Sequence, residues 1–128
     1  MKFYFVKFTH KETCEEFYKF GVTKENQVEN RFDPYFQNSR FYNDRYKYLE
    51  FDVRVLFSMY CSKEDAYKIE NEFKTRYPKN FSLENYLGKP HNYFSNGFTG
   101  ITETVVLDDN TYKKVLRELY NLKTTYSS

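Results

Sequence analysis

The chain has 128 residues, the length of one domain with a real core, and we expect residues 1–128 to form a single domain. Its 20 basic and 18 acidic residues give a formal net charge of +2, which excludes binding of nucleic acid by bulk electrostatics, so any such contact has to come from a local cluster. Aromatic residues, 14 Phe and 14 Tyr, should mostly fill the core and its rim, which leaves few to stack on bases.

The first 22 residues predict two strands of a hairpin. Apolar residues occupy both alternating sides of residues 2–8, the pattern of a central strand that is covered on both faces. Residues 9–16 are polar and predict the connection. Residues 17–22 predict the second strand, which ends at Gly21.

A helix and a third strand are predicted next. Thr23 is a suitable N-cap for a helix over residues 24–32, and Pro34 argues against its continuation. Residues 35–46 are irregular. Residues 48–57 alternate apolar and polar side chains, which predicts a strand with one buried and one solvated face.

The second half predicts two longer helices. Ser62 and Asp65 form a capping box that opens a helix over residues 63–77, which ends before Pro78. The loop that follows leads to a short strand over residues 101–107. A final helix is capped by Asp108 or Asp109 and carries on one face Tyr112, Val115, Leu116, Leu119 and Tyr120.

This order of elements predicts an α+β fold. We expect a small three-stranded antiparallel sheet flanked by helices, with an extra C-terminal helix.

Glu70 is the most informative polar residue of the helix over 63–77. The apolar stripe of that helix consists of Ala66, Ile69, Phe73 and Tyr77, and Glu70 shares its spacing, unlike the other acids of the helix. An inward carboxylate needs a cation, a metal ion or a hydrogen-bond network. The alternative is an edge position with the carboxylate in water, or a salt bridge to Arg31.

Three further residues have both a functional and a structural interpretation. Arg31 follows Val28 by three residues and could hold a phosphate oxygen, or simply pack its stem on aromatic rings. Lys19 lies in an otherwise apolar strand and could serve the same site, or protect an edge strand against aggregation. Tyr4 in such a strand is usually core.

The chain carries no sign of export or of a membrane span. Cys14 and Cys61 are distant from each other and lack the spacing of a zinc site, so we expect two reduced thiols. Charge returns after four residues at the N-terminus, too soon for a signal peptide, and no apolar run has membrane-spanning length. We therefore expect a cytoplasmic protein without membrane partners.

Four segments together resemble the GIY-YIG nuclease superfamily. Residues 4–7 (YFVK) stand at the first motif strand, residues 19–23 (KFGVT) at the second, Arg31 in the next helix, and residues 66–70 (AYKIE) at the glutamate helix of the family. The resemblance covers roughly residues 3–104. Lys19 stands where a second tyrosine is usual, as in some branches of the family, and Tyr18 lies one residue earlier.

The resemblance implies an endonuclease that hydrolyses phosphodiester bonds with one Mg²⁺ ion. Tyr4 would be the general base that activates water, with Lys19 favouring its phenolate. Glu70 would hold the metal ion, and Arg31 would clamp the phosphate. His10, on the hairpin connection, is an alternative base, although a solvated loop residue is the simpler expectation for it.

The loops around the site would then determine which nucleic acid is bound. Because we expect no attached DNA-binding domain, nucleic-acid contacts are expected from Arg40, Arg45, Lys89 and Asn92, in loops that also suit an ordinary solvated role. The late polar residue that the family often adds to its site could be Asn92, Asn96 or Glu103.

The expected partner is nucleic acid, DNA rather than RNA, and the composition resembles small phage proteins, which would work in the host cytoplasm. The alternative function is an inactive GIY-YIG-like module that binds nucleic acid or protein. The third interpretation is an unrelated α+β domain with chance matches, which a wide separation of Tyr4, Lys19, Arg31 and Glu70 would establish.

Overall fold

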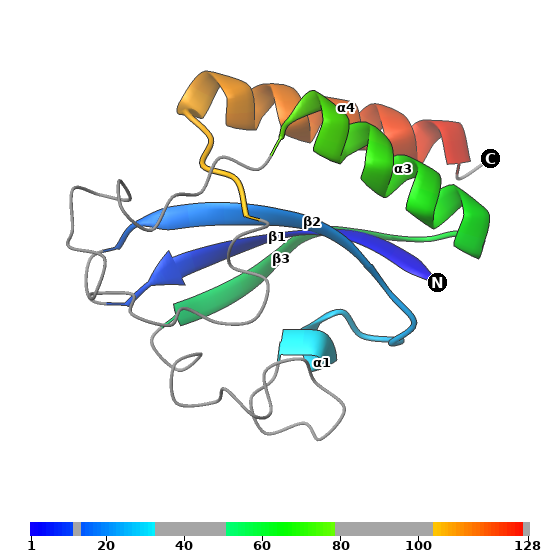
Figure 1. Ribbon diagram of the computed structural model, residues 1–128, viewed down its shortest axis with the longest axis horizontal. Coiled ribbons are helices and arrows are strands. Elements are labelled where there is room, and N and C mark those ends of the chain that lie inside the picture. Colours follow the sequence, from blue (N-terminus) through cyan, green and yellow to red (C-terminus); the bar gives the residue numbers. More distant parts are fainter. Residues whose placement is uncertain (12–13, 33–50, 79–103, 127–128) are drawn as a thin grey trace.

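A three-stranded antiparallel sheet is the centre of the fold in the computed structural model, which describes residues 1–11, 14–32, 51–78 and 104–126. The strands are β1 (Lys2–His10), β2 (Glu16–Thr23) and β3 (Phe51–Tyr60), in the order β2-β1-β3 (Figure 1). The helices are α1 (Glu29–Phe32), α3 (Lys63–Arg76) and α4 (Asp109–Tyr126). The fold is therefore α+β with a C-terminal helix, as the sequence predicts.

β1 is the central strand because both of its alternating sides are apolar. Phe3 and Phe5 point to one face of the sheet, and Tyr4 and Phe8 point to the other, each at most 1% exposed. A register shift against β3 lies between Phe5 and Val6. The double-sided pattern of residues 2–8 therefore predicts the position of this strand correctly.

α3 and α4 together cover one face of the sheet (Figure 1). The Ser62 hydroxyl accepts the Asp65 N–H at 3.1 Å, which confirms the predicted cap of α3. The Asp108 carboxylate accepts the Thr111 N–H at 2.7 Å and thereby caps α4. The core of this face consists of Phe3, Phe5, Tyr18, Phe20, Met59, Ile69, Phe73, Tyr77, Val105, Val115 and Leu119.

α1 lies on the opposite face and is much shorter than predicted. The sequence suggested a helix over residues 24–32, but only Glu29–Phe32 is helical. The Thr23 hydroxyl accepts the Glu25 N–H at 3.1 Å, a local turn that competes with the first helical turn. The Lys2 ammonium donates to the Asn26 carbonyl, which also holds this segment as a turn.

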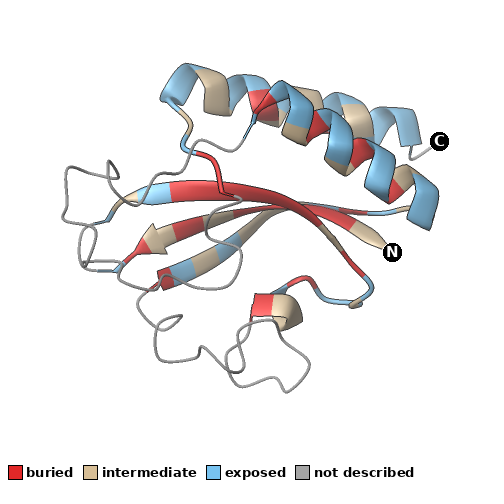
Figure 2. Ribbon diagram, in the orientation of Figure 1, coloured by how far each residue is buried: buried red, intermediate tan, exposed pale blue. Residues whose placement is uncertain are grey.

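The second core lies between this segment and the sheet. Its buried members are Tyr4, Val6, Phe8, Phe17, Val28, Phe32 and Phe51. Buried residues run along β1 and β2 and along the sheet-facing sides of α3 and α4 (Figure 2). The sheet is thus covered on both faces, by two long helices on one side and by the α1 segment on the other.

Other sequence predictions have mixed outcomes. Of the short strand proposed over residues 101–107, the described part forms a single bridge, in which Tyr18 and Val105 exchange two hydrogen bonds of 2.8 Å. Tyr120 was placed on the apolar face of α4 but is 75% exposed, because the stripe through Val115 and Leu119 leaves it on the flank.

The remaining predictions concern the cysteines and membranes. Cys14 and Cys61 are both free thiols. Among the described residues, no helix has the length and apolar character needed to cross a membrane.

Candidate functional site

Tyr4 reaches the outer edge of the sheet across a glycine. Tyr4 pairs with Gly21 in the β1–β2 register, and direct antiparallel partners point to the same face. A Cβ atom at Gly21 would lie 2.3 Å from the Tyr4 hydroxyl oxygen and 2.4 Å from the ring carbon Cζ, so any larger side chain would require the phenol to move. The phenol therefore lies over Gly21 and carries its hydroxyl to β2, which is an edge strand of the described sheet.

Lys19 lies on the same face as Tyr4 because it is two residues from Gly21. Its partner across the strands is Val6, which makes Lys19 a diagonal neighbour of Tyr4, at a spacing that long side chains can span. Lys19 is only 4% exposed. That burial does not fit the alternative of a solvated lysine that guards a strand edge.

Arg31 is positioned by the aromatic residue that follows it. The Phe32 ring packs edge-on against Tyr4 at 5.5 Å and against Phe8 at 5.7 Å, so this end of α1 is fixed to the second core. Val28, 2% exposed, anchors the preceding turn. The neighbouring Arg31 is half-buried and faces the same space as the Tyr4 hydroxyl.

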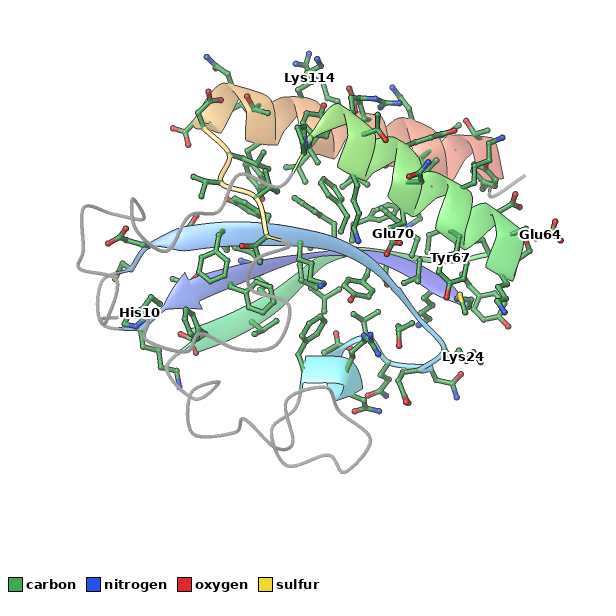
Figure 3. The ribbon with its side chains drawn as sticks, in the orientation of Figure 1. His10, Lys24, Glu64, Tyr67, Glu70 and Lys114 are labelled. Atoms are coloured by element: carbon green, nitrogen blue, oxygen red, sulfur yellow. The ribbon has the colours of Figure 1, made fainter. Side chains whose placement is uncertain are left out.

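Glu70 flanks the buried stripe of α3, whereas its spacing predicted that it shares the stripe. Ala66, Ile69 and Phe73 are at most 3% exposed, and the Glu70 side chain is 19% exposed beside them. The Glu70 side chain leaves α3 on the side that faces the sheet, whereas Glu64 lies at the N-terminal end of the helix (Figure 3). Glu70 is therefore a half-buried carboxylate that faces the region beside β2.

These four side chains line one cleft of about 250 Å³ at the edge of β2. They come from four different elements: Tyr4 from β1, Lys19 from β2, Arg31 from α1 and Glu70 from α3. The other described residues that line the cleft are Gly21, Val22, Tyr67 and Lys74. A wide separation of the four side chains would have established the interpretation as an unrelated domain, and the shared cleft does not show such a separation.

The cleft has a local positive charge that the whole chain does not reveal. Its described lining contains three cationic residues, Lys19, Arg31 and Lys74, and one anionic residue, Glu70. The lining therefore carries a formal +2, which equals the net charge of the chain, so the other formal charges of the chain sum to zero. The lining is thus a local cationic cluster of the kind that the composition requires for contact with nucleic acid.

Two residues of the cleft, Tyr67 and Lys74, are absent from the sequence prediction. They stand three residues before and four residues after Glu70, so all three lie in one row along α3. The Lys74 ammonium lies 3.6 Å from a Glu70 carboxylate oxygen. The helical spacing from Glu70 was the signal that could have identified both.

His10 is neither near the cleft nor solvated. It is the last residue of β1, six residues from Tyr4, a distance of roughly 20 Å along a strand. It is 3% exposed, and its ring packs edge-on against Phe51 at 5.1 Å (His10 is labelled in Figure 3). The prediction of an alternative base is wrong, and so is the expectation of a solvated loop residue.

Tyr18, one residue before Lys19, does not line the cleft, because alternation along β2 turns it to the opposite face. Its ring stacks between Phe5 and Tyr112, and its hydroxyl donates to a Glu16 carboxylate oxygen at 3.3 Å. Burial raises the pKa of Tyr18 far above its usual range, and the charge of Glu16 raises it further. Tyr18 is therefore a structural phenol.

The predicted nucleic-acid contacts lie outside the described residues. This holds for Arg40, Arg45, Lys89 and Asn92, and for the candidate late polar residues Asn96 and Glu103.

Comparisons of the chain with protein-family models, with curated proteins and with solved structures found no match. Its function is therefore inferred from the chemistry of the cleft.

Proposed function

We propose that the chain is a divalent-metal-dependent endonuclease of the GIY-YIG type that hydrolyses phosphodiester bonds in nucleic acid. The observation that carries the proposal is the convergence of Tyr4, Lys19, Arg31 and Glu70 on one cleft. These are the residues that the resemblance selects from the sequence, without any use of the fold. DNA as the substrate rests on that resemblance, and so does a phage origin.

The charge of the cleft supports an anionic substrate. A phosphodiester carries one negative charge and two non-bridging oxygens, which suits a guanidinium fork beside an ammonium group. Arg31 and Lys19 are half-buried and buried respectively, so their attraction to phosphate is screened less than that of surface cations. Glu70 adds a carboxylate, which binding of a phosphate alone does not need but which can bind a metal ion.

The donor set suits a metal ion that is held partly by substrate. Within the described part of the chain, no group of three His, Cys, Asp or Glu side chains is placed to hold a metal ion. Glu70 is the one carboxylate among the described residues of the cleft. Mg²⁺ accepts one or two carboxylates when phosphate oxygens and water complete its shell, so Glu70 fits as its protein ligand.

The chemistry then divides among the four residues. The Tyr4 oxygen takes a proton from the attacking water as that water bonds to phosphorus and the bond to the leaving oxygen breaks. Lys19 favours the phenolate form of Tyr4 as a neighbouring positive charge. Arg31 binds a non-bridging oxygen and stabilises the charge that builds up there. A bound Mg²⁺ would supply further stabilisation of the phosphoryl and leaving oxygens.

A second candidate function is a phosphate-binding module that does not cut nucleic acid. It is favoured by the ion pair of 3.6 Å between Lys74 and Glu70, because this contact competes with a metal ion for the carboxylate. Lys19 in place of a second tyrosine points the same way. Such a module would bind nucleic acid through the same cleft.

The deciding experiment is cleavage of supercoiled DNA and of structured RNA with Mg²⁺. Glu70→Ala should reduce cleavage at least ~100-fold, because several kcal/mol of charge stabilisation depend on the metal ion. Glu72→Ala is the matched control, an exposed glutamate two residues away that does not line the cleft. Wild-type protein that is folded yet cuts neither substrate would favour the binding module, and cleavage that survives Glu70→Ala would exclude the mechanism.

A further inference from the structure

Exposed tyrosines occur at four described positions, and one of them differs from the rest. Tyr60, Tyr67, Tyr120 and Tyr126 are all more than a third exposed. Tyr67 is the one that lines the cleft. It is 47% exposed, and within the described part of the chain its ring contacts no other ring and its hydroxyl makes no hydrogen bond.

Each buried tyrosine packs its ring against another aromatic ring. Tyr4 packs against Phe32, Tyr18 stacks on Phe5, and Tyr77 stacks on Phe20. Tyr67 has no such neighbour, although its side chain leaves α3 on the same side as Glu70 (Figure 3). An aromatic face left open beside a cationic cleft suits a planar ligand that carries a phosphate.

Three cleft residues on α3 would contact a bound strand in a fixed order. Tyr67, Glu70 and Lys74 follow one another at three and four residues, so the two ends are about 10.5 Å apart along the helix axis. An aromatic ring stands at one end, a carboxylate in the middle and an ammonium group, 38% exposed, at the other. This arrangement matches a base, the scissile phosphate and a neighbouring phosphate of one strand.

We propose that Tyr67 stacks on an unpaired base next to the scissile phosphate, so that the cleft selects single-stranded or locally unpaired nucleic acid. The proposal rests on the proposed function, because it takes the phosphate subsite from it. A base inside a duplex is stacked on both sides, so its face is closed to Tyr67. Lys74, in contrast, contacts only the backbone and treats paired and unpaired strands alike.

The test measures binding in EDTA, where the proposed cleavage is switched off. A fluorescent single-stranded oligonucleotide and its duplex are titrated with wild type, Tyr67→Ala, Tyr67→Phe and Lys74→Ala. Tyr67→Ala should weaken single-strand binding roughly 5- to 150-fold, the effect of one stacked base, and leave duplex binding unchanged. Tyr67→Phe should restore single-strand binding, since it keeps the ring. Lys74→Ala should weaken both and lower the salt slope by about one.

The control is Tyr120→Ala, which removes a still more exposed tyrosine, 75% against 47% for Tyr67, from α4 and outside the cleft lining. A second readout, which a merely structural role would not move, is the fluorescence of 2-aminopurine placed in the single strand. Wild type and Tyr67→Phe should quench it, and Tyr67→Ala should not. Single-strand binding that is equal in wild type, Tyr67→Ala and Tyr120→Ala would overturn the proposal.

The two proposals fail separately. Cleavage that depends on Glu70, with binding and quenching indifferent to Tyr67, would retain the nuclease and reject the stacking role. Quenching that depends on Tyr67, without cleavage by folded wild type, would reject the nuclease and retain an unpaired strand as the ligand.

Discussion

The two faces of this sheet are built from aromatic residues of the same kinds, yet they differ in how completely they are filled. Beneath α3 and α4, rings pack on rings: Phe5 stacks on Tyr18 at 5.4 Å and on Phe20 at 4.8 Å. On the α1 face, the same strands bring Tyr4 and Lys19 to a cationic cleft. One face is filled to stabilise the fold, and the other keeps an opening of about 250 Å³.

Tyr18 and Tyr4, one on each face of the sheet, illustrate the difference between the faces. Tyr18 lies beside the carboxylate of Glu16, and its buried hydroxyl loses its proton with difficulty, as its raised pKa records. Tyr4 lies over a glycine and shares its cleft with three cations. The alternation of β2 therefore turns Tyr18 to the face covered by α3 and α4, and Lys19 and Gly21 to the face with the cleft. Neighbouring residues of one edge strand thus have a packed environment on one face and an open, cationic one on the other.

The largest change in stability should come from the helix-covered face. Phe5 is fully buried, so Phe5→Ala should cost about 3–5 kcal/mol of unfolding free energy, measured by urea denaturation. Cleavage per folded molecule should stay at the wild-type level, because Phe5 does not line the cleft. A loss of cleavage well beyond the loss of folded protein would show that the two faces are not separable.

Gly21→Ala should affect both stability and chemistry. Glycine inside a strand normally costs stability relative to alanine, yet here a Cβ atom would meet the hydroxyl oxygen and two ring carbons of Tyr4 at 2.3–2.8 Å. We expect a loss of about 1–3 kcal/mol and, because the phenol has to move, a loss of cleavage. In a Tyr4→Ala background the same change should become neutral or stabilising. An equal cost in both backgrounds would contradict the placement of Tyr4 over Gly21.

The smallest effect should come from the α4 cap, and it depends on pH. The backbone N–H of Thr111 donates to the Asp108 carboxylate and lowers its pKa below the usual 3.8. A lowered native pKa stabilises the folded state above pH 3.8, and the effect is lost as the pH falls through the native value. Asp108→Asn should therefore lower the Tm slightly at pH 7, and the two Tm values should converge below that range. A Tm difference that is constant with pH would contradict this role.

Alternation and helical spacing predicted most of the framework. The two-sided apolar pattern of residues 2–8 predicted the central strand, and the spacing of Glu70 from Ala66 and Phe73 predicted a position close to the buried stripe of α3. These succeed because the period of side-chain burial is set by the backbone itself. The prediction of a helix over residues 24–32 was wrong for most of that range. The Thr23 hydroxyl accepts the backbone N–H of Glu25, and this local turn competes with the first helical turn, an effect that helix propensity does not include.

The candidate site was only partly predictable. Tyr4, Lys19, Arg31 and Glu70 were found through the resemblance, whereas their convergence depends on Gly21, whose missing side chain lets Tyr4 reach the strand edge. Tyr67 and Lys74 look like ordinary solvated positions of a helix in the sequence. Their relevance follows from the tertiary position of α3 beside β2, which no local pattern encodes.

The most direct test of the account is the cleavage rate of Tyr4→Phe. This change removes one oxygen and retains the ring that packs over Gly21 and against Phe32, so stability should stay within about 1 kcal/mol of wild type. Mg²⁺-dependent cleavage should fall about 10²- to 10⁴-fold, the contribution of a positioned general base. A Tyr4→Phe protein that folds normally and cuts within a few-fold of the wild-type rate would contradict the assignment of this cleft as a tyrosine-based phosphodiesterase site.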